Sequence, residues 1–222
     1  MEEVKLYGKW PSPFYYRVLW TLKLKGIPFE YIEEDIKNKS PQLLQYNPVY
    51  KKIPVLVHGG KPICESMNIV QYIDEVWPQN SLLPADPYER SVARFWVTFA
   101  EDKGIPIMIK AFNTRGEEQE KAFEESLEML RIVEEQCLGE KKFFGGDNLN
   151  IVDIAFGAIV HYFGLIAEIS RFKLFEVEKF SHLHAWIKNF EEIPTIKENL
   201  PDHDKTVTFF KARREAQISG SS

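Results

Sequence analysis

Cysteine is scarce in this chain of 222 residues, and so are metal-ligand patterns. The two cysteines, Cys64 and Cys137, follow no C-x-x-C or zinc-ligand spacing, and this usage fits a reducing compartment. The five histidines are equally scattered, so the sequence predicts no metal site.

The chain also lacks an excess of positive charge and a long apolar run. Its formal net charge is -5 and its lysines are interspersed with acids, which disfavours binding to a nucleic-acid backbone. Residues 1–5 hold no apolar signal-peptide core, and no stretch approaches the roughly 18 apolar residues of a membrane span. We therefore expect a soluble protein of the cytosol, bound neither to nucleic acid nor to a membrane.

The first third of the chain alternates between strand and helix patterns. Strands are predicted over 4–7, 29–33, 53–57 and 62–64, and helices over 14–25, from 41, and over 67–76. The order β-α-β-α-β-β-α is that of the thioredoxin-like fold, in which a proline at the start of the third strand follows a cis bond. We therefore expect a cis peptide between Ile53 and Pro54, an inference from fold because only about 5–6% of X-Pro bonds are cis.

The remainder of the chain shows only helical periodicity. Pro, Asn, Ser and Asp between 77 and 87 indicate a linker. The sequence thus predicts a thioredoxin-like α/β domain over 1–77, a linker over 78–88 and an all-α domain over 89–222. Helices are expected over 89–113, 117–138, 151–169 and 183–193, with a frayed tail at 218–222.

One helix start carries a specific folding signal. Asn150 can cap the helix from 151, with Asp153 as the reciprocal partner of a capping box. By analogy with other lost caps, Asp153→Ala is expected to lower stability by about 1 kcal/mol.

Several segments, in this order and spacing, resemble the plant tau class of glutathione transferases over most of the chain. They are Trp10-Pro11-Ser12-Pro13-Phe14, Glu33-Glu34-Asp35, Asn38-Lys39-Ser40, Asn47-Pro48-Val49, Lys51-Lys52-Ile53-Pro54-Val55-Leu56, Gly60-Lys61-Pro62-Ile63-Cys64-Glu65-Ser66, Asp86-Pro87-Tyr88-Glu89-Arg90, Ala93-Arg94-Phe95-Trp96 and Phe143-Phe144-Gly145-Gly146-Asp147. The resemblance implies a homodimer whose amino-terminal domain binds glutathione as co-substrate, with no further cofactor. A small hydrophobic electrophile would lie against the helical domain.

The resemblance makes Ser12 the candidate catalytic residue. Its local sequence also suits an ordinary helix cap, because Pro13 follows at the first helical position. In the catalytic interpretation, the hydroxyl and the free N–H groups of the helix start stabilise the glutathione thiolate. Lowering the thiol pKa by about two units from its usual 8.5 requires roughly 2.7 kcal/mol of preferential thiolate stabilisation.

The other glutathione contacts are likewise implied by the resemblance and fit the groups that glutathione presents. Glu65 would receive the γ-glutamyl ammonium, and Ser66 the adjoining carboxylate. Ile53, beside Pro54, would pair with the cysteinyl backbone. The remaining candidates are charged: Lys39 and Lys52 for the glycyl carboxylate, and Arg17 and Asp102 as supports of the γ-glutamyl end.

The acceptor pocket is expected to draw on three stretches of chain, although apolar residues at helical spacing more often form core. The candidates are Pro11, Phe14, Tyr15, Ile105, Pro106, Ile109, Lys110, Asn113, Phe209, Phe210 and Arg213. Many tau relatives carry further aromatic or arginine side chains where this chain has Pro106, Lys110 and Asn113. The range of acceptors therefore stays open.

Three other functions use a related site. A glutathione-dependent peroxidase or isomerase would use the same thiolate and differ only in its acceptor. A thiol oxidoreductase would need a cysteine near Ser12, where the sequence has none. A non-catalytic carrier would store apolar ligands in the acceptor pocket.

Overall fold

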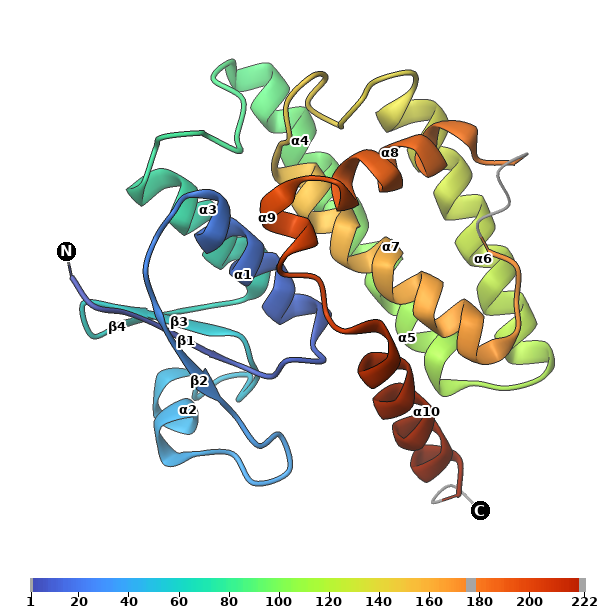
Figure 1. Cartoon of the computed structure of the whole chain (residues 1–222), viewed down its shortest axis with the longest axis horizontal. Helices are drawn as coiled ribbons and strands as arrows, with labels where there is room; N and C mark the ends of the chain where they lie inside the picture. The colour runs from blue at the N-terminus through green and yellow to red at the C-terminus, as the bar shows by residue number, and fades with distance from the viewer. Residues whose placement is uncertain (1, 175–178, 220–222) are drawn as a thin grey trace. The chain divides into compact units, whose positions relative to one another are not determined.

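A computed structural model describes residues 2–174 and 179–219 of the chain. It comprises two compact units (Figure 1). The first contains residues 1–83 together with 194–200, and the second contains 84–193 and 201–222. Of the expected tail at 218–222, residues 220–222 lie outside the described residues.

The first unit has the predicted order β-α-β-α-β-β-α. Its elements are β1 (Val4–Gly8), α1 (Pro13–Leu24), β2 (Glu30–Glu33), α2 (Pro41–Tyr46), β3 (Val55–His58), β4 (Lys61–Cys64) and α3 (Ser66–Val76), followed much later in the chain by the short α9 (Pro194–Lys197). The strands form one mixed sheet in the order β2-β1-β3-β4. β1 is parallel to β2 and antiparallel to β3, which is antiparallel to β4. The peptide bond between Ile53 and Pro54 is cis, as predicted.

Helices cover both faces of this sheet, α1 and α3 on one side and α2 on the other (Figure 1). Because strand side chains alternate, neighbouring residues of β1 serve opposite faces. Tyr7 packs with Val55, Val57 and Leu43 on the α2 side. The adjacent Leu6 is completely buried and is paired in register with Leu56. The sheet therefore has apolar side chains on both of its faces.

A buried ion pair ties the end of α1 to α3 and to the segment after it. The ammonium of Lys25 lies 2.7 Å from Asp74 Oδ1, and the Lys25 side chain is completely buried. The same ammonium donates to the carbonyls of Trp77, Gln79 and Asn80 at 2.8, 2.9 and 3.3 Å. One cation thus satisfies an acid and three carbonyl groups.

Asp74 accepts from further donors at both of its carboxylate oxygens. The N–H groups of Leu82 and Leu83 donate to it at 2.7 and 3.0 Å, and the Ser81 hydroxyl at 2.9 Å. Burial by itself raises the pKa of Asp74, but Lys25 and these donors outweigh burial and hold the pKa below its usual value.

Within its described residues the second unit contains helices joined by loops, with two isolated β-bridges between 143 and 148. Its elements are α4 (Pro87–Phe99), the π turn η1 (Ala100–Gly104), α5 (Ile105–Asn113), α6 (Glu117–Val133), the π turn η2 (Glu134–Leu138), α7 (Ile151–Ser170), α8 (Ser181–Glu191) and α10 (His203–Ser219). The helices predicted over 89–113 and 117–138 are thus each modified by a π turn, which the sequence reading missed.

The π turn η1 has a physical reason in Pro106, the second residue of α5. Proline has no N–H to donate, and its ring clashes with the carbonyl four residues before it in a regular α-helix. A π turn widens the helix by one residue and relieves such a conflict. Pro106 was the signal for this interruption.

Helix α7 forms the core of the second unit, where it packs against α4, α5, α8 and α10. Contrary to the sequence expectation, this helix is long and apolar enough to cross a membrane by length and composition. However, 83% of its apolar window is buried inside the protein, so α7 is a core helix.

The predicted capping box at the start of α7 is present, and Asp153 does more than close it. Asp153 Oδ2 accepts from the Asn150 N–H at 2.7 Å. Its Oδ1 accepts from the Phe144 N–H at 3.0 Å and from Trp186 Nε1 at 2.8 Å. The completely buried carboxylate therefore joins the preceding loop, α7 and α8.

Candidate functional site

Several of the predicted glutathione residues lie next to strand termini that meet at one edge of the sheet. Tyr7 near the end of β1 is paired with Val55 at the start of β3, and Val55 is paired with Cys64 at the end of β4. The segments that carry Ser12 and Glu65–Ser66 leave the sheet at this edge, and the segment that carries Ile53–Pro54 enters it there. β2 ends there too, because it runs parallel to β1.

Ser12 is the N-cap residue of α1 and has extended backbone angles. Its side chain makes no capping hydrogen bond, and within the described residues its hydroxyl has no protein partner. Ser40 provides the contrast, because it also precedes a proline at a helix start and caps its helix by accepting from the Leu43 N–H at 3.1 Å. The Ser12 hydroxyl is consequently available to a ligand.

The γ-glutamyl end is predicted to bind at the turn between β4 and α3. Glu65 is exposed there and adopts φ 68° and ψ 120°, a region that costs a non-glycine residue about 1–3 kcal/mol and is common at functional sites. Ser66 is buried, and its hydroxyl accepts from Arg17 Nη1 at 3.2 Å. Arg17 is completely buried in α1, with its guanidinium carbon 5.6 Å from the centre of the Phe14 ring. The structure therefore brings Arg17 and Ser66 together.

The two predicted lysines are both free to receive an anion. Lys39 is half-buried and Lys52 exposed, and neither forms an ion pair with any described residue. The backbone of Lys52 is held by the buried Asn47, whose Nδ2 donates to the Lys52 carbonyl at 3.0 Å and whose Oδ1 accepts from the Tyr50 N–H at 3.1 Å. Asn47 is a structural residue that sequence reasoning quoted only as part of a motif, with no role.

The acceptor-pocket candidates of the first unit differ in exposure. Phe14 is half-buried, whereas Pro11 and Tyr15 are buried. Burial raises the pKa of Tyr15 to about 12, with a smaller contribution from Glu33, so this phenol stays protonated at neutral pH. Burial and the neighbouring Glu65 also raise the pKa of the Cys64 thiol, which makes it a poor nucleophile.

The candidates on α5 are divided between two sides of the helix. Pro106, Ile109 and Asn113 are exposed, Lys110 is half-buried, and Ile105 is buried. The Lys110 ammonium lies 2.9 Å from Glu125 on α6 and is therefore already paired. Asp102, the predicted support of the γ-glutamyl end, is exposed in the π turn η1.

The candidates on α10 are similarly split. Phe210 is buried and makes edge contacts with Phe112 and Tyr162. Phe209 is half-buried, and Arg213 is exposed with its guanidinium carbon 5.8 Å from the centre of the Phe112 ring. These two side chains remain accessible to a ligand.

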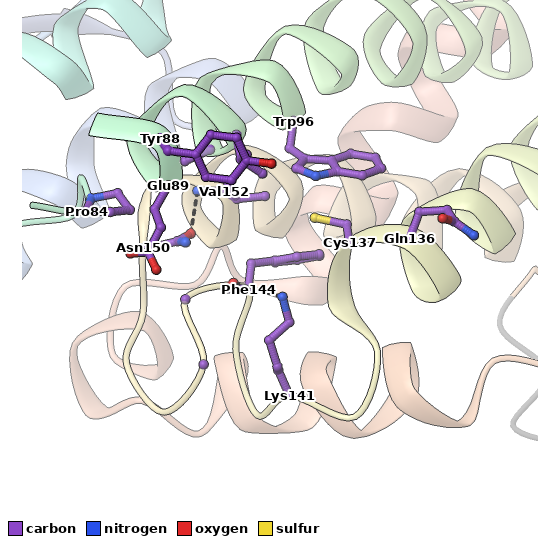
Figure 2. Close-up of a pocket in the computed structure, with 14 residues that line it drawn as sticks. Pro84, Tyr88, Glu89, Trp96, Gln136, Cys137, Lys141, Phe144, Asn150 and Val152 are labelled. Atoms are coloured by element: carbon purple, nitrogen blue, oxygen red, sulfur yellow. Dashed lines mark hydrogen bonds between the residues drawn. The ribbon is translucent and has the colours of Figure 1, made fainter. Parts of the chain in front are cut away.

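A separate cavity of about 370 Å³ lies in the helical unit, and none of the predicted site residues lines it (Figure 2). Tyr88 and Trp96 of α4 lie on one side of it and Phe144 on the other. Cys137 also lines the cavity, but burial raises the pKa of its thiol to about 12. This cavity therefore offers no thiolate for catalysis.

Two domain families match this chain. Residues 2–75 match "Glutathione S-transferase, N-terminal domain", and residues 97–194 match "Glutathione S-transferase, C-terminal domain". Among curated proteins, a probable glutathione S-transferase of Nicotiana tabacum is 47% identical over 222 residues, which cover 100% of this chain and 99% of the relative. Glutathione S-transferase U7 of Arabidopsis thaliana is 44% identical over 214 residues, covering 96% of this chain and 94% of the relative.

Two solved structures are similar along nearly their whole length. The tau class glutathione S-transferase of mango, Mangifera indica, superposes with a TM-score of 0.86 at 38% identity, covering 95% of this chain and 98% of the other. Rice GST1 (OsGSTU1), solved in complex with glutathione, gives a TM-score of 0.89 at 35% identity, covering 97% of both chains.

Proposed function

Because this chain belongs to the tau class of plant glutathione transferases, we propose that it conjugates glutathione to small hydrophobic electrophiles, with Ser12 stabilising the thiolate. The observation that carries the proposal is the Ser12 hydroxyl at the start of α1, which caps no helix N–H group. Glutathione transferase activity itself follows from the close relatives.

The proposed chemistry is a nucleophilic substitution or addition by sulfur. The glutathione thiol loses its proton to solvent, and the Ser12 O–H donates a hydrogen bond to the resulting thiolate. The sulfur then forms a bond to the electrophilic carbon. In a substitution the leaving group departs with the electrons of its own bond, and in an addition the π electrons move onto the neighbouring atoms, which take up a proton from solvent. Ser12 keeps its proton throughout, because a hydrogen-bond donor is sufficient to favour the thiolate.

The remaining glutathione contacts form a proposal of their own. Ser66 and the N–H groups of the α3 start would hold the γ-glutamyl carboxylate, with the buried Arg17 charge behind them. Glu65 would hold the ammonium, and the Ile53 backbone the cysteinyl unit. The further candidates keep their predicted roles: Lys39 and Lys52 at the glycyl carboxylate, and Asp102 at the γ-glutamyl end.

Each unit offers candidate contacts to the acceptor, the half-buried Phe14 in the first and the apolar side chains of α5 and α10 in the second. The exposed Ile109 and the half-buried Phe209 support an apolar acceptor. Apolar contacts discriminate weakly between similar molecules, so we expect a broad range of electrophiles.

The test compares wild type with Ser12→Ala in the conjugation of an aryl halide across pH. Loss of the donor should lower kcat/KM at neutral pH by about 100-fold and move the activity profile to higher pH. Ser12→Thr, which retains a hydroxyl, is the matched control and should keep part of the activity. An unchanged profile in Ser12→Ala would refute the role of Ser12, whereas turnover of organic hydroperoxides alone would favour the peroxidase alternative.

We also propose that the protein is a homodimer. Large apolar side chains stand exposed in both units, notably Val49 at 78%, Tyr50 at 59%, Tyr88 at 76% and Phe95 at 60%. Exposed apolar side chains mark protein interfaces where they form a patch. Sedimentation should show a dimer that Tyr50→Glu or Phe95→Glu weakens, and a stable wild-type monomer would contradict the proposal.

A cytosolic location is proposed on chemical grounds. Cys64 and Cys137 are both free thiols, which suits a reducing compartment that also holds reduced glutathione. Microscopy of this protein fused to a fluorescent protein in plant cells tests the location, and fluorescence confined to an organelle would contradict it.

A further inference from the structure

Both carboxylate oxygens of Glu34, the residue after β2, accept hydrogen bonds from Ser40. Glu34 is only 2% exposed. Its Oε2 accepts from the Ser40 N–H at 3.1 Å, and its Oε1 accepts from the Ser40 hydroxyl at 2.5 Å. Within the described residues no cation pairs with this carboxylate, although buried acids are costly without compensation. The cost of burying this carboxylate must therefore be offset by what its two hydrogen bonds hold in place.

The two contacts close a loop that carries a predicted glutathione ligand. The Glu34 N–H donates to the Gly8 carbonyl of β1 at 2.8 Å, which fixes the first end of the loop 35–39 to the sheet. The Glu34 carboxylate fixes the other end through Ser40. Lys39 is the last residue of the loop and directly precedes Ser40.

The loop interior is also ordered by hydrogen bonds. Asp35 Oδ1 accepts from the Lys37 N–H at 3.0 Å, and the Asp35 carbonyl accepts from the Asn38 N–H at 3.1 Å. The backbone that carries Lys39 is consequently fixed before any ligand arrives.

We propose that Glu34 is a positioning residue for glutathione, which holds Ser40 so that Lys39 is directed at the glycyl carboxylate. The inference rests on the proposed role of Lys39 in glutathione binding. Prior ordering of a loop lowers the entropy that a ligand must remove on binding, and this gain appears as affinity for the group that the loop contacts. Glu34 therefore acts through Lys39 and touches no reacting atom.

The experiment measures steady-state conjugation with two thiol substrates, glutathione and γ-glutamylcysteine, the second of which lacks the glycyl carboxylate. Glu34→Ala should raise KM for glutathione about tenfold, which corresponds to about 1.4 kcal/mol. Its kcat at saturating glutathione should stay within about twofold, and its KM for γ-glutamylcysteine should equal that of wild type.

A double-mutant cycle separates positioning from general support of the fold. In a Lys39→Ala background, adding Glu34→Ala should leave KM for glutathione unchanged. Glu34→Gln keeps an acceptor for the Ser40 N–H and can donate to the Ser40 hydroxyl, so it should restore nearly wild-type KM. Glu33→Ala removes the neighbouring exposed acid, which pairs with Lys9 at 2.9 Å, and is the matched control.

The outcomes distinguish failure of this inference from failure of the binding role of Lys39. Equal increases in KM for both thiols, or an additive effect in the Lys39→Ala background, would show that Glu34 only supports the fold. An unchanged KM in Lys39→Ala alone would remove the Lys39 assignment and this inference with it, while Ser12→Ala would still report on the thiolate. Thermal melts of each variant identify any loss of folded protein.

Discussion

Each unit of the protein buries one aspartate that organises its surroundings, yet the two acids have opposite electrostatic environments. Asp74 in the first unit and Asp153 in the second are 4% and 0% exposed. The pKa of Asp74 is lowered, whereas burial raises the pKa of Asp153 to about 6. Both carboxylates accept several hydrogen bonds. The difference is the ammonium of Lys25, which lies 2.7 Å from Asp74.

The comparison shows that neutral donors alone do not offset burial of this carboxylate. At Asp153 the donors include the Asn150 and Phe144 N–H groups and the Trp186 indole, all of which favour the charged form, but desolvation is the larger effect. Asp153 therefore stabilises the helical unit as a hydrogen-bond acceptor, and its charge opposes that stabilisation. Asp74 contributes through both its hydrogen bonds and its charge.

The largest effect is expected from Asp153→Ala. The substitution leaves the Phe144 and Asn150 N–H groups and the Trp186 indole buried without an acceptor, each at a cost of about 1–3 kcal/mol. We expect a loss of about 5 kcal/mol of unfolding free energy, more than the capping box alone predicts. Urea denaturation measures it against Asp147→Ala, an exposed acid nearby, and a loss near 1 kcal/mol would show that the cap is the whole effect.

Lys25→Met should leave Asp74, like Asp153, as a buried carboxylate that has only neutral hydrogen-bond donors. Removing one member of a buried ion pair leaves an uncompensated charge, so we expect a loss of about 3 kcal/mol. The pKa of Asp74 should also rise, because burial would then oppose only neutral donors. Stability measured between pH 3 and 7 detects both changes. If the loss stayed below 1 kcal/mol, the cation would not be what distinguishes the two acids.

The two acids should also respond to pH in opposite directions. Because the pKa of Asp153 is raised from 3.8 to about 6 in the folded protein, its favourable contribution is present at low pH and is lost as pH rises through 6. The contribution of Asp74 is present above its usual pKa and is lost as pH falls through its lowered folded value.

A titrating Asp153 can be isolated with Asp153→Asn, which carries no titratable group. Between pH 4.5 and 7 the wild type should lose about 2 kcal/mol of unfolding free energy relative to this variant. All other groups titrate in both proteins, so the difference between the two slopes of unfolding free energy against pH is due to Asp153. Parallel pH profiles would mean that the carboxylate stays charged throughout this range.

The smallest effect is expected from an exposed ion pair that matches the buried one in chemistry. Lys110 and Glu125 are separated by 2.9 Å, but their side chains are 37% and 39% exposed. Water already solvates such charges, so Glu125→Gln should change stability by less than about 1 kcal/mol, and less at high salt. A loss as large as that of Lys25→Met would show that burial is not decisive.

The element order and the capping box were predictable because both depend on local pattern. Side-chain alternation identified the strands of the first unit, and the Asn150 and Asp153 spacing identified the start of α7. The same local pattern could not decide between Ser12 and Ser40, which both precede a proline at a helix start. Only the structure shows that Ser40 caps its helix and that Ser12 does not.

Two kinds of feature escaped the sequence reading for physical reasons. Long-range pairs, such as Lys25 with Asp74 or Trp186 with Asp153, leave no spacing signal because the partners are brought together by packing. Helix α10 was not predicted because it buries only a short strip of residues, among them Thr206, Val207 and Phe210. The roles of the glutathione and acceptor residues rest on resemblance and await the proposed tests.

The π turn η1 decides which side chains α5 exposes. It adds one residue to a helical turn, so every side chain of α5 is rotated by about 100° from where an uninterrupted helix would place it. The exposed row of Pro106, Ile109 and Asn113 exists only in this register. Because the π turn absorbs the extra residue, deleting a single residue from 100–104 would leave this row on the same side of α5, and a change in the proposed acceptor surface would have to come from substitutions within the row itself.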